Sequence, residues 1–435
     1  MVGLFMSRGI LRNWLAPLFI LILLGSITAY VLTSNIETHA ANSYDPKIFG
    51  IGESLMSRSI WEKENFSLQS AFDAIKCLNA TRLREWTWVS LLLVNETTVN
   101  VTNKEVLDAV ISNMSAINVT ILGVVQDCPN WMTGIYGIYD TQAVPDRNTT
   151  SGSNYMHFLQ KYNESWKTLV EAFPSITMWE IGNEYNADDF LHGYNETSNS
   201  TVSFTDLMRT DILVDLLYYG SSGIHLGNPN ATTVLGGLAE ADSKSISVIT
   251  NSLRDIYENI EDRSNISITN STDPDNYFQV ACWHPYLFNV TPTSVSWVVP
   301  NNEVYQVMVD HGDSDKRVIF SEFGYRDVND NTPEEVARYL NETFQLASES
   351  LPWLDTIYWF RLVDPSPETV EDINPAGYGI IALNWTWKPA AHSYQNLILS
   401  VVPEYPIAIV LPLIIAVTLV AVIIYKKRPS ILPHL

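Results

Sequence analysis

Short apolar runs alternate with segments of helical periodicity from about residue 45 to residue 400, and this alternation limits the possible folds most strongly. Unbroken apolar runs are typical of parallel strands that are buried on both faces. The predicted strands are residues 47–52, 80–86, 119–125, 176–185, 233–238, 278–283, 317–325 and 356–360. Eight strands that alternate with helices predict an α/β chain, and a closed (β/α)8 TIM barrel is favoured over an open sheet.

Helix signals separate the predicted strands. Thr-Pro-Glu-Glu at residues 332–335 forms a capping box, and Asn103 is expected to cap the helix before the third strand. The other expected helices cover residues 69–78, 104–117, 155–173, 204–219, 245–260, 303–310 and 390–399. Long loops follow four of the strands, at residues 127–154, 185–203, 285–302 and 361–376, whereas helix-to-strand connections are short. Elaboration of one face predicts that the functional site lies at the C-terminal ends of the strands.

Two of the predicted strands end in a glutamate. The first of these strands, residues 176–185, closes with Gly-Asn-Glu184, and the second, residues 317–325, carries Glu322 near its end. The carboxyl ends of parallel strands meet at one face of a barrel, so the two carboxyl groups are expected there together. Hydrolysis of a glycosidic bond requires such a pair, with one carboxyl group on either side of the anomeric carbon.

The motif Trp-Glu-Ile-Gly-Asn-Glu at residues 179–184, followed by Phe-Ser-Glu-Phe-Gly at residues 320–324, resembles the clan A (4/7 superfamily) barrel glycoside hydrolases. Cellulase-type family 5 and the β-xylosidase-like family 39 are the most similar, and the resemblance spans roughly residues 45 to 400. It implies that Glu184 is the acid/base, that Glu322 is the nucleophile, and that hydrolysis proceeds with retention and without a cofactor. Retention predicts carboxyl groups about 5 to 5.5 Å apart, whereas a gap near 9 Å would indicate inversion.

The resemblance also implies substrate-binding residues. Asn183 would donate to the sugar hydroxyl beside the anomeric carbon. His284 and Tyr286 match a His-x-Tyr pattern in which the tyrosine holds the nucleophile and the histidine lines the subsite. Arg82 matches the arginine that keeps the nucleophile ionised, but Arg84 lies on the same side of the strand, so the choice between them stays open.

Aromatic residues complete the predicted cleft. Trp359, at the end of the eighth strand, resembles the aromatic floor beneath the reacting sugar. Trp131 and other loop aromatics suit a polysaccharide cleft because indole and phenol rings stack on the apolar faces of sugars, although packing within its own loop is the commoner role of each residue. The others are Tyr136, Tyr139, Tyr185, Tyr194 and Trp297. The third strand departs from the family, since it ends in Gln-Asp-Cys-Pro at residues 126–129, where the cellulase type often has His.

The formal net charge of −23 argues against nucleic acid as a partner, because phosphate backbones require clustered Lys and Arg. It is typical of a soluble, self-repelling surface, and adaptation to acid or salt is the alternative. Cys77, Cys128 and Cys282 allow at most one disulfide, and at least one of them is expected to be a buried, unpaired thiol. The chain shows no cluster with metal-ligand spacing, so no metal site is predicted.

Both ends of the chain carry membrane-type sequences. Residues 1–33 are predicted to be a signal peptide or a retained signal anchor. Residues 406–425 are predicted to form a transmembrane helix, followed by a basic cytoplasmic tail at residues 426–435. The domain between them, residues 45–400, would then lie outside the cell membrane. Sequons from Asn65 to Asn384 indicate that this surface is glycosylated.

The sequence therefore predicts a membrane-anchored, extracellular retaining β-glycoside hydrolase that acts on an oligo- or polysaccharide, in the manner of an endo-β-glucanase or a β-glycosidase. The alternative is a cell-surface glycan-binding or envelope protein that has kept the barrel and lost catalysis. The two glutamates favour the enzyme, and the unusual end of the third strand leaves the alternative open.

Overall fold

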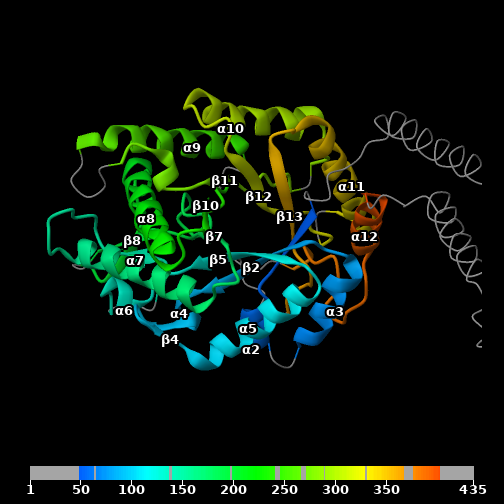
Figure 1. Cartoon of the computed structure of the whole chain (residues 1–435). Helices are drawn as coiled ribbons and strands as arrows, with labels where there is room; N and C mark the ends of the chain where they lie inside the picture. The colour runs from blue at the N-terminus through cyan, green and yellow to red at the C-terminus, as the bar shows by residue number, and fades with distance from the viewer. Residues whose placement is uncertain are drawn as a thin grey trace, which may run out of the picture. The chain divides into compact units, whose positions relative to one another are not determined.

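The computed structural model describes residues 49–401, apart from residues 63–64, 137–139, 196–197, 241–244, 266–270, 289, 329–330 and 367–375 (Figure 1). The predicted signal or anchor at residues 1–33, the predicted transmembrane helix at 406–425 and the predicted tail at 426–435 lie outside the described residues, and so does Tyr139. Within the part of the chain that is described, no helix has the length and apolar character needed to cross a bilayer.

Eight parallel strands close into a barrel, which confirms the predicted (β/α)8 architecture. Around the barrel they are β1 (Phe49–Glu53), β2 (Arg82–Trp88), β5 (Thr120–Gln126), β7 (Met178–Ile181), β10 (Thr232–Leu235), β11 (Val280–Cys282), β12 (Arg317–Phe323) and β13 (Leu354–Phe360). Closure is made by β13 against β1, with Gly50 opposite Tyr358. The ring lies at the centre of the ribbon, with helices outside it (Figure 1).

The predicted helices are all present, seven between barrel strands and the last, α12, after β13. They are α3 (Leu68–Leu78), α5 (Val101–Ala116), α7 (Asn154–Ala172), α8 (Asp206–Gly227), α9 (Ile246–Glu261), α10 (Val299–Asp310), α11 (Pro333–Ser350) and α12 (Pro389–Val401). The capping box before α11 is confirmed, since Thr332 and Glu335 bond each other's backbone N–H. Asn103 as a helix cap is wrong: the chain turns into α5 three residues earlier, and Asn100 accepts from the backbone N–H of Asn103.

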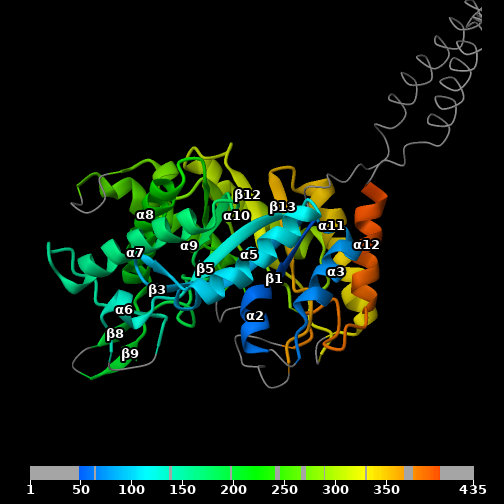
Figure 2. The ribbon, with the colours of Figure 1, turned by 60° about the horizontal axis from the view of Figure 1, so that its bottom comes forward.

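Small elements in the loops after the strands were not predicted. They are α2 (Leu55–Trp61), α4 (Val89–Leu92), the hairpin β3 (Leu93–Asn95) and β4 (Thr98–Val99), α6 (Asn130–Thr133), and a sheet of β6 (Ala143–Val144), β8 (His192–Asn195) and β9 (Ser200–Val202). In Figure 2, α6, β8 and β9 lie together at the lower left. The sheet joins the loop after β5 to the loop after β7, and so fixes two long loops at the face where the strands end.

All three cysteines are free thiols. Cys128 and Cys282 are buried, as expected of small apolar side chains, and Cys77 is exposed.

Candidate active site

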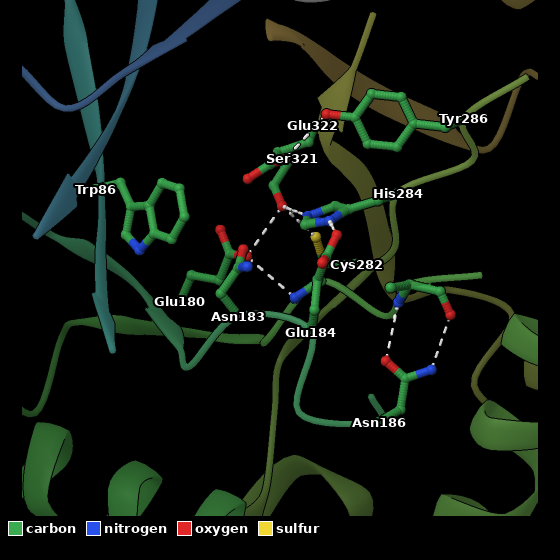
Figure 3. Close-up of polar contacts among 12 residues, drawn as sticks. Trp86, Glu180, Asn183, Glu184, Asn186, Cys282, His284, Tyr286, Ser321 and Glu322 are labelled. Carbon is green, nitrogen blue, oxygen red and sulfur yellow. Dashed lines mark hydrogen bonds and ion pairs between the residues drawn. The ribbon is translucent and has the colours of Figure 1, made fainter. Parts of the chain in front are cut away.

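A cavity of about 880 Å³ opens at the C-terminal ends of the barrel strands. Its wall includes Asn183 and Glu184 after β7, His284 and Tyr286 after β11, and Glu322 on β12. Figure 3 shows these side chains converging on one space from different strands. The predicted location of the site, on the elaborated face of the barrel, agrees with this position.

The carboxyl groups of Glu184 and Glu322 lie close together in this cavity. One oxygen of each, together with a ring nitrogen of His284, falls within a set of atoms that are all within 4.8 Å of one another. Glu184 reaches this position because the chain leaves β7 abruptly: Gly182 has φ +78° and Glu184 has φ +53°. The backbone N–H of Glu184 then donates to Gly237 O at 2.9 Å, which anchors the turn to the neighbouring strand end.

Glu322 is held in the ionised form. Burial alone would raise the pKa of this carboxyl group, but the electrostatic effects of the His284 ring and the Arg84 guanidinium, together with the hydrogen bond from Tyr286, outweigh burial and lower the pKa. The Tyr286 hydroxyl donates to Glu322 Oε2 at 2.9 Å, and Arg84 Nη1 donates to Oε1. Glu322 therefore faces the cavity as a carboxylate.

Glu184 shows the opposite shift. Burial raises the pKa of Glu184, and the negative charge of Glu322 raises it further, whereas the hydrogen bond with His284 and the charge of Arg84 oppose the rise. Glu184 Oε1 lies 2.6 Å from His284 Nδ1. Two neighbouring carboxyl groups with opposite pKa shifts are suited to an acid and a nucleophile in the same site.

Arg84, rather than Arg82, is the arginine of the site. Arg84 is buried and donates to Glu180 from Nε and Nη2, at 2.8 and 2.9 Å, and to Asn183 Oδ1 at 2.7 Å, besides its bond to Glu322. Arg82 lies on the same side of β2 but one pleat lower, where it pairs with Asp355 at 2.6 Å. Arg82 as a substrate-binding residue is therefore wrong, because strand alternation sets the face of a side chain but not its depth in the barrel.

The ring of His284 is also held on the side that faces away from Glu184. Its Nε2 lies 2.8 Å from Ser321 Oγ, and Ser321 Oγ also contacts Glu180 and Cys282. A Cβ at Gly237 would lie only 2.0 Å from His284 Nε2, so only glycine allows the chain after β10 to pass this close to the ring. No sequence pattern predicts this set of contacts, apart from the positions of its members near strand ends.

Two predicted tryptophans are not brought to the cavity. Trp359 is fully buried and packs against Phe323 and Tyr325, with ring centroids 6.0 and 6.4 Å away. The neighbouring residue Phe360 lines the cavity in its place, because consecutive side chains of a strand point to opposite faces. Trp131 lies in α6 and is not among the residues that line the cavity.

Trp86, at the end of β2, is an aromatic cavity residue that sequence reasoning missed. Its ring stacks on Trp88, with centroids 5.3 Å apart and planes at 19°. Its Nε1–H donates at 3.0 Å to Gln126, the residue that ends β5. Gln126 belongs to the Gln-Asp-Cys-Pro segment that departs from the cellulase-type pattern. Its side chain holds the indole ring of Trp86 at the cavity wall.

Acidic residues gather on the side of the cavity next to α8. Asp188, Asp189 and Glu240 line this wall together with Arg209 and His192. Burial, reinforced by the charge of Glu184, raises the pKa of Glu240 to about 8, so this carboxyl group is mainly protonated at neutral pH.

Two trios of side chains have ligand atoms close enough to hold a metal ion, among the residues that the structure describes. They are Glu180, Cys282 and His284, and Glu184, His284 and Glu322. Both trios already exchange hydrogen bonds with one another, with Arg84 or with Ser321, which accounts for their close approach.

No protein-family model matches the chain, and none of the curated proteins does. Solved structures do match. A family 39 glycoside hydrolase from the gut symbiont Bacteroides cellulosilyticus matches with a TM-score of 0.56 and 15% identity, over 84% of this chain and 65% of that chain. The chain thus spans just under two thirds of the length of that enzyme.

Two further structures match over most of their own length. A Glu-to-Ala variant of GH5_18 from Streptomyces cattleya, in complex with Manβ1-4GlcNAc, has a TM-score of 0.54 and 14% identity, over 82% of each chain. A β-glucosidase from Thermotoga maritima has a TM-score of 0.54 and 11% identity, over 81% of this chain and 97% of that chain. These glycoside hydrolases share the eight-stranded parallel barrel of this chain. At such low identity the likeness establishes the fold, and the activity has to be argued from the site.

Proposed function

We propose that the chain is a retaining β-glycoside hydrolase in which Glu322 is the nucleophile and Glu184 the acid/base. The observation that carries the proposal is that one oxygen of Glu184 lies within 4.8 Å of one oxygen of Glu322, combined with the opposite pKa shifts of the two carboxyl groups. Inverting enzymes separate their carboxyl groups by about 6.5–9.5 Å to admit a water molecule, so the observed spacing supports retention. The glycoside hydrolases of similar fold support the same class of reaction.

In the first step the Glu322 carboxylate attacks the anomeric carbon. The bond from that carbon to the glycosidic oxygen breaks, its electron pair stays on the oxygen, and Glu184 transfers its proton to the same oxygen. The ester between Glu322 and the sugar is the covalent intermediate. Tyr286 and Arg84, which bond the two oxygens of Glu322, orient the nucleophile for attack.

In the second step Glu184, now ionised, takes a proton from water, and the water oxygen attacks the anomeric carbon and displaces Glu322. Two inversions give net retention. Asn183 Oδ1 accepts from Arg84, so the NH₂ group of this amide is the part that a sugar hydroxyl would meet. Trp86 and Phe360 supply apolar surface for the faces of the sugar rings.

The proposed substrate is a β-linked oligo- or polysaccharide at the outer surface of a membrane. Residues 406–425 would hold the enzyme there, and the sequons would carry glycans. Deleting residues 402–435 should move the protein from the membrane fraction to the soluble fraction. Continued membrane binding of that variant would assign the anchor to residues 1–33 instead.

The test of the catalytic assignment replaces each glutamate separately. Glu184→Gln and Glu322→Gln should each lower turnover of β-glucans by about 10³-fold or more, since each removes a group required by the chemistry. Glu261→Gln, which changes an exposed glutamate on α9, is the matched control. Full activity in both cavity variants would refute the proposal, and glycan binding without turnover by the unaltered protein would favour the non-catalytic alternative.

The azide ion separates the two roles. In Glu322→Ala, azide fits the space of the nucleophile and should give the α-glycosyl azide by one inversion. In Glu184→Ala, azide attacks the covalent intermediate and should give the β-glycosyl azide. Exchange of the two products between the variants would reverse the assignment.

A further inference from the structure

Ser321, the residue before Glu322, makes three polar contacts beneath the cavity. Its Oγ lies 2.9 Å from Glu180 Oε1, 2.8 Å from His284 Nε2 and 2.9 Å from Cys282 Sγ (Figure 3). Ser321 and His284 are both fully buried, so these contacts are made away from solvent. A hydroxyl group has one proton to donate and two lone pairs, so one of the three contacts is a donation and two are acceptances.

The proton of Ser321 goes to Glu180. Among the described residues, the other hydrogen-bond partners of the Glu180 carboxylate are donors: Arg84 Nε at 2.8 Å, Arg84 Nη2 at 2.9 Å and the backbone N–H of Gly237 at 3.0 Å. A proton on Glu180 would meet one of these donors, so Glu180 accepts at both oxygens. Ser321 Oγ must then accept from its two remaining neighbours, the Cys282 thiol and an N–H at His284 Nε2.

The other nitrogen of His284 faces the acid/base. With the Nε2 position protonated, a neutral imidazole has a bare Nδ1, and this atom lies 2.6 Å from Glu184 Oε1. Two bare acceptors would not approach this closely, so one proton lies between them, on Glu184 or on His284. We propose that Ser321, backed by Glu180, fixes the Nε2–H form of His284 and thereby makes His284 and Glu184 a pair that stores one transferable proton.

This pair explains how Glu184 changes roles, and the explanation rests on the proposed function. When the proton passes to the glycosidic oxygen, the C–O electron pair stays on the leaving group and the Glu184 carboxylate faces the bare Nδ1. Two facing acceptors repel each other, which drives Glu184 to recover a proton from water in the second step. Ser321 touches no cavity surface and acts through His284, so it is a positioning residue.

The charged and titratable groups that face the pair remain in place when Ser321 is changed. Glu322 and Arg84 act on Glu184 from β12 and β2, and Glu240 faces Glu184 from the loop after β10. Glu180 and Cys282 lie beneath His284, and Tyr286 follows it on the chain. A change in the pH profile on replacing Ser321 therefore reports on the His284 contact.

The kinetic test compares Ser321→Ala with the conservative Ser321→Thr and with Ser221→Ala, which removes a buried hydroxyl on α8 outside the cavity lining. Without the acceptor, His284 can move its proton to Nδ1 and stabilise ionised Glu184. The alkaline limb of kcat/KM should then move down by about one pH unit in Ser321→Ala. Turnover of oligosaccharides should fall about tenfold or more, while 2,4-dinitrophenyl glycosides, whose leaving group needs no proton, should change less than about twofold.

Ser321→Thr should restore the profile, and Ser221→Ala should leave it unchanged. An equal loss for both substrates with no movement of the alkaline limb would overturn the proposal, because that pattern indicates only structural damage.

A spectroscopic test does not depend on activity or on the folding of a variant. The ¹⁵N spectrum of the unaltered full chain, labelled at histidine and compared with His284→Gln, should show a protonated Nε2 for His284 at neutral pH. A bare Nε2 with a protonated Nδ1 would refute the proposal. Failure of the proposed function would appear instead as full activity in the Glu184→Gln and Glu322→Gln variants, so the two failures are distinguishable.

Discussion

Arg84 supports three groups of the candidate site, and its loss removes the guanidinium that pairs with two buried carboxylates, Glu180 and Glu322. Removing one partner of a buried ion pair typically costs about 3–5 kcal/mol, so Arg84→Ala should be strongly destabilised. Arg84→Lys keeps the charge but cannot bond Glu180, Asn183 and Glu322 from one planar group. We expect its turnover to fall by about 10²-fold with a smaller loss of stability. Steady-state kinetics and thermal melts check both effects.

Arg82 provides the control for this prediction. Arg82 pairs with Asp355 in a partly exposed position, so Arg82→Lys should keep near-normal turnover. Loss of activity in the Arg82 variant with normal activity in the Arg84 variant would contradict the assignment made from the structure.

The pH dependence of activity follows from two residues. Glu184 must be protonated to act as the acid, and its pKa is raised, so activity should persist above the ordinary glutamate range and fall as pH rises through that raised pKa. Glu322 must be ionised, and its pKa is lowered, so activity should fall only in strong acid. The plot of kcat/KM against pH is therefore expected to be a broad bell-shaped curve. Glu184→Gln should remove the alkaline limb from the residual activity on dinitrophenyl glycosides, and retention of that limb would assign it to another group.

Sequence reasoning located some side chains and misplaced others for a geometric reason. The barrel brings the ends of its strands together, and this places Glu184, Glu322, His284 and Tyr286 in one cavity. The choice between Arg82 and Arg84 stayed open, and Trp359 was predicted where Phe360 lines the cavity, because a strand sequence shows alternation but not which of two positions reaches the cavity. Ser321 belongs to no sequence motif, and its partners Glu180, Cys282 and His284 meet it only in the folded barrel.

At the scale of elements, three tryptophans from α2 and β2 form a row that begins in the cavity. Trp86 lines the cavity and stacks on Trp88, and Trp61, at the end of α2, lies 4.6 Å from Trp88 between ring centroids. Trp61 is 53% exposed, which is unusual for an indole ring with no ligand. We expect Trp61→Ala to raise KM for a long β-glucan about five- to tenfold, in line with roughly 1 kcal/mol for an aromatic stack.

The same variant should leave turnover of aryl monosaccharide glycosides unchanged, because those substrates end inside the cavity. Tyr136→Ala changes an exposed aromatic residue that does not line the cavity, and it serves as the control. An equal effect of Trp61→Ala on both substrates would show that Trp61 supports the fold instead of extended chains.

Helices and strands of the barrel were predictable because each buries an apolar face with a regular period, as α9 and β5 do. The elements of the loops were not. The strands β6, β8 and β9 are two to four residues long, too short to show a period, and they form because loops that are far apart in sequence meet over the barrel. The helix α2, which carries the exposed Trp61, was not predicted either, because its seven residues are too few to show a helical period.

At the scale of the whole molecule, buried acids make stability depend on pH. Burial raises the pKa of Glu85 and of Glu240 to about 8 and that of Asp127 to about 7. In an unfolded chain these groups ionise near their ordinary values, so the folded state binds more protons at neutral pH. Their contribution to stability is therefore complete below about pH 4 and is lost as pH rises toward 8.

Groups with lowered pKa values act in the other direction. Glu53, buried against Arg361 and Arg58, contributes stability that is present above the ordinary glutamate range and is lost as pH falls through its lowered pKa. The net charge of −23 at neutral pH adds self-repulsion, which also weakens as pH falls. The buried acids and the self-repulsion both favour higher stability in mild acid than above neutral pH, whereas Glu53 sets the loss of stability in stronger acid.

Thermal unfolding of the full chain should therefore give a midpoint roughly 5–10 °C higher at pH 5 than at pH 8. Added salt should raise the midpoint at pH 8 more than at pH 5, because it screens the repulsion of a larger negative charge. Glu240→Gln should reduce the difference between the two pH values, since glutamine removes one carboxyl group that resists ionisation in the folded state. A midpoint that is higher at pH 8 would mean that the ion pairs of the barrel, such as Glu53 with Arg361, outweigh the buried acids.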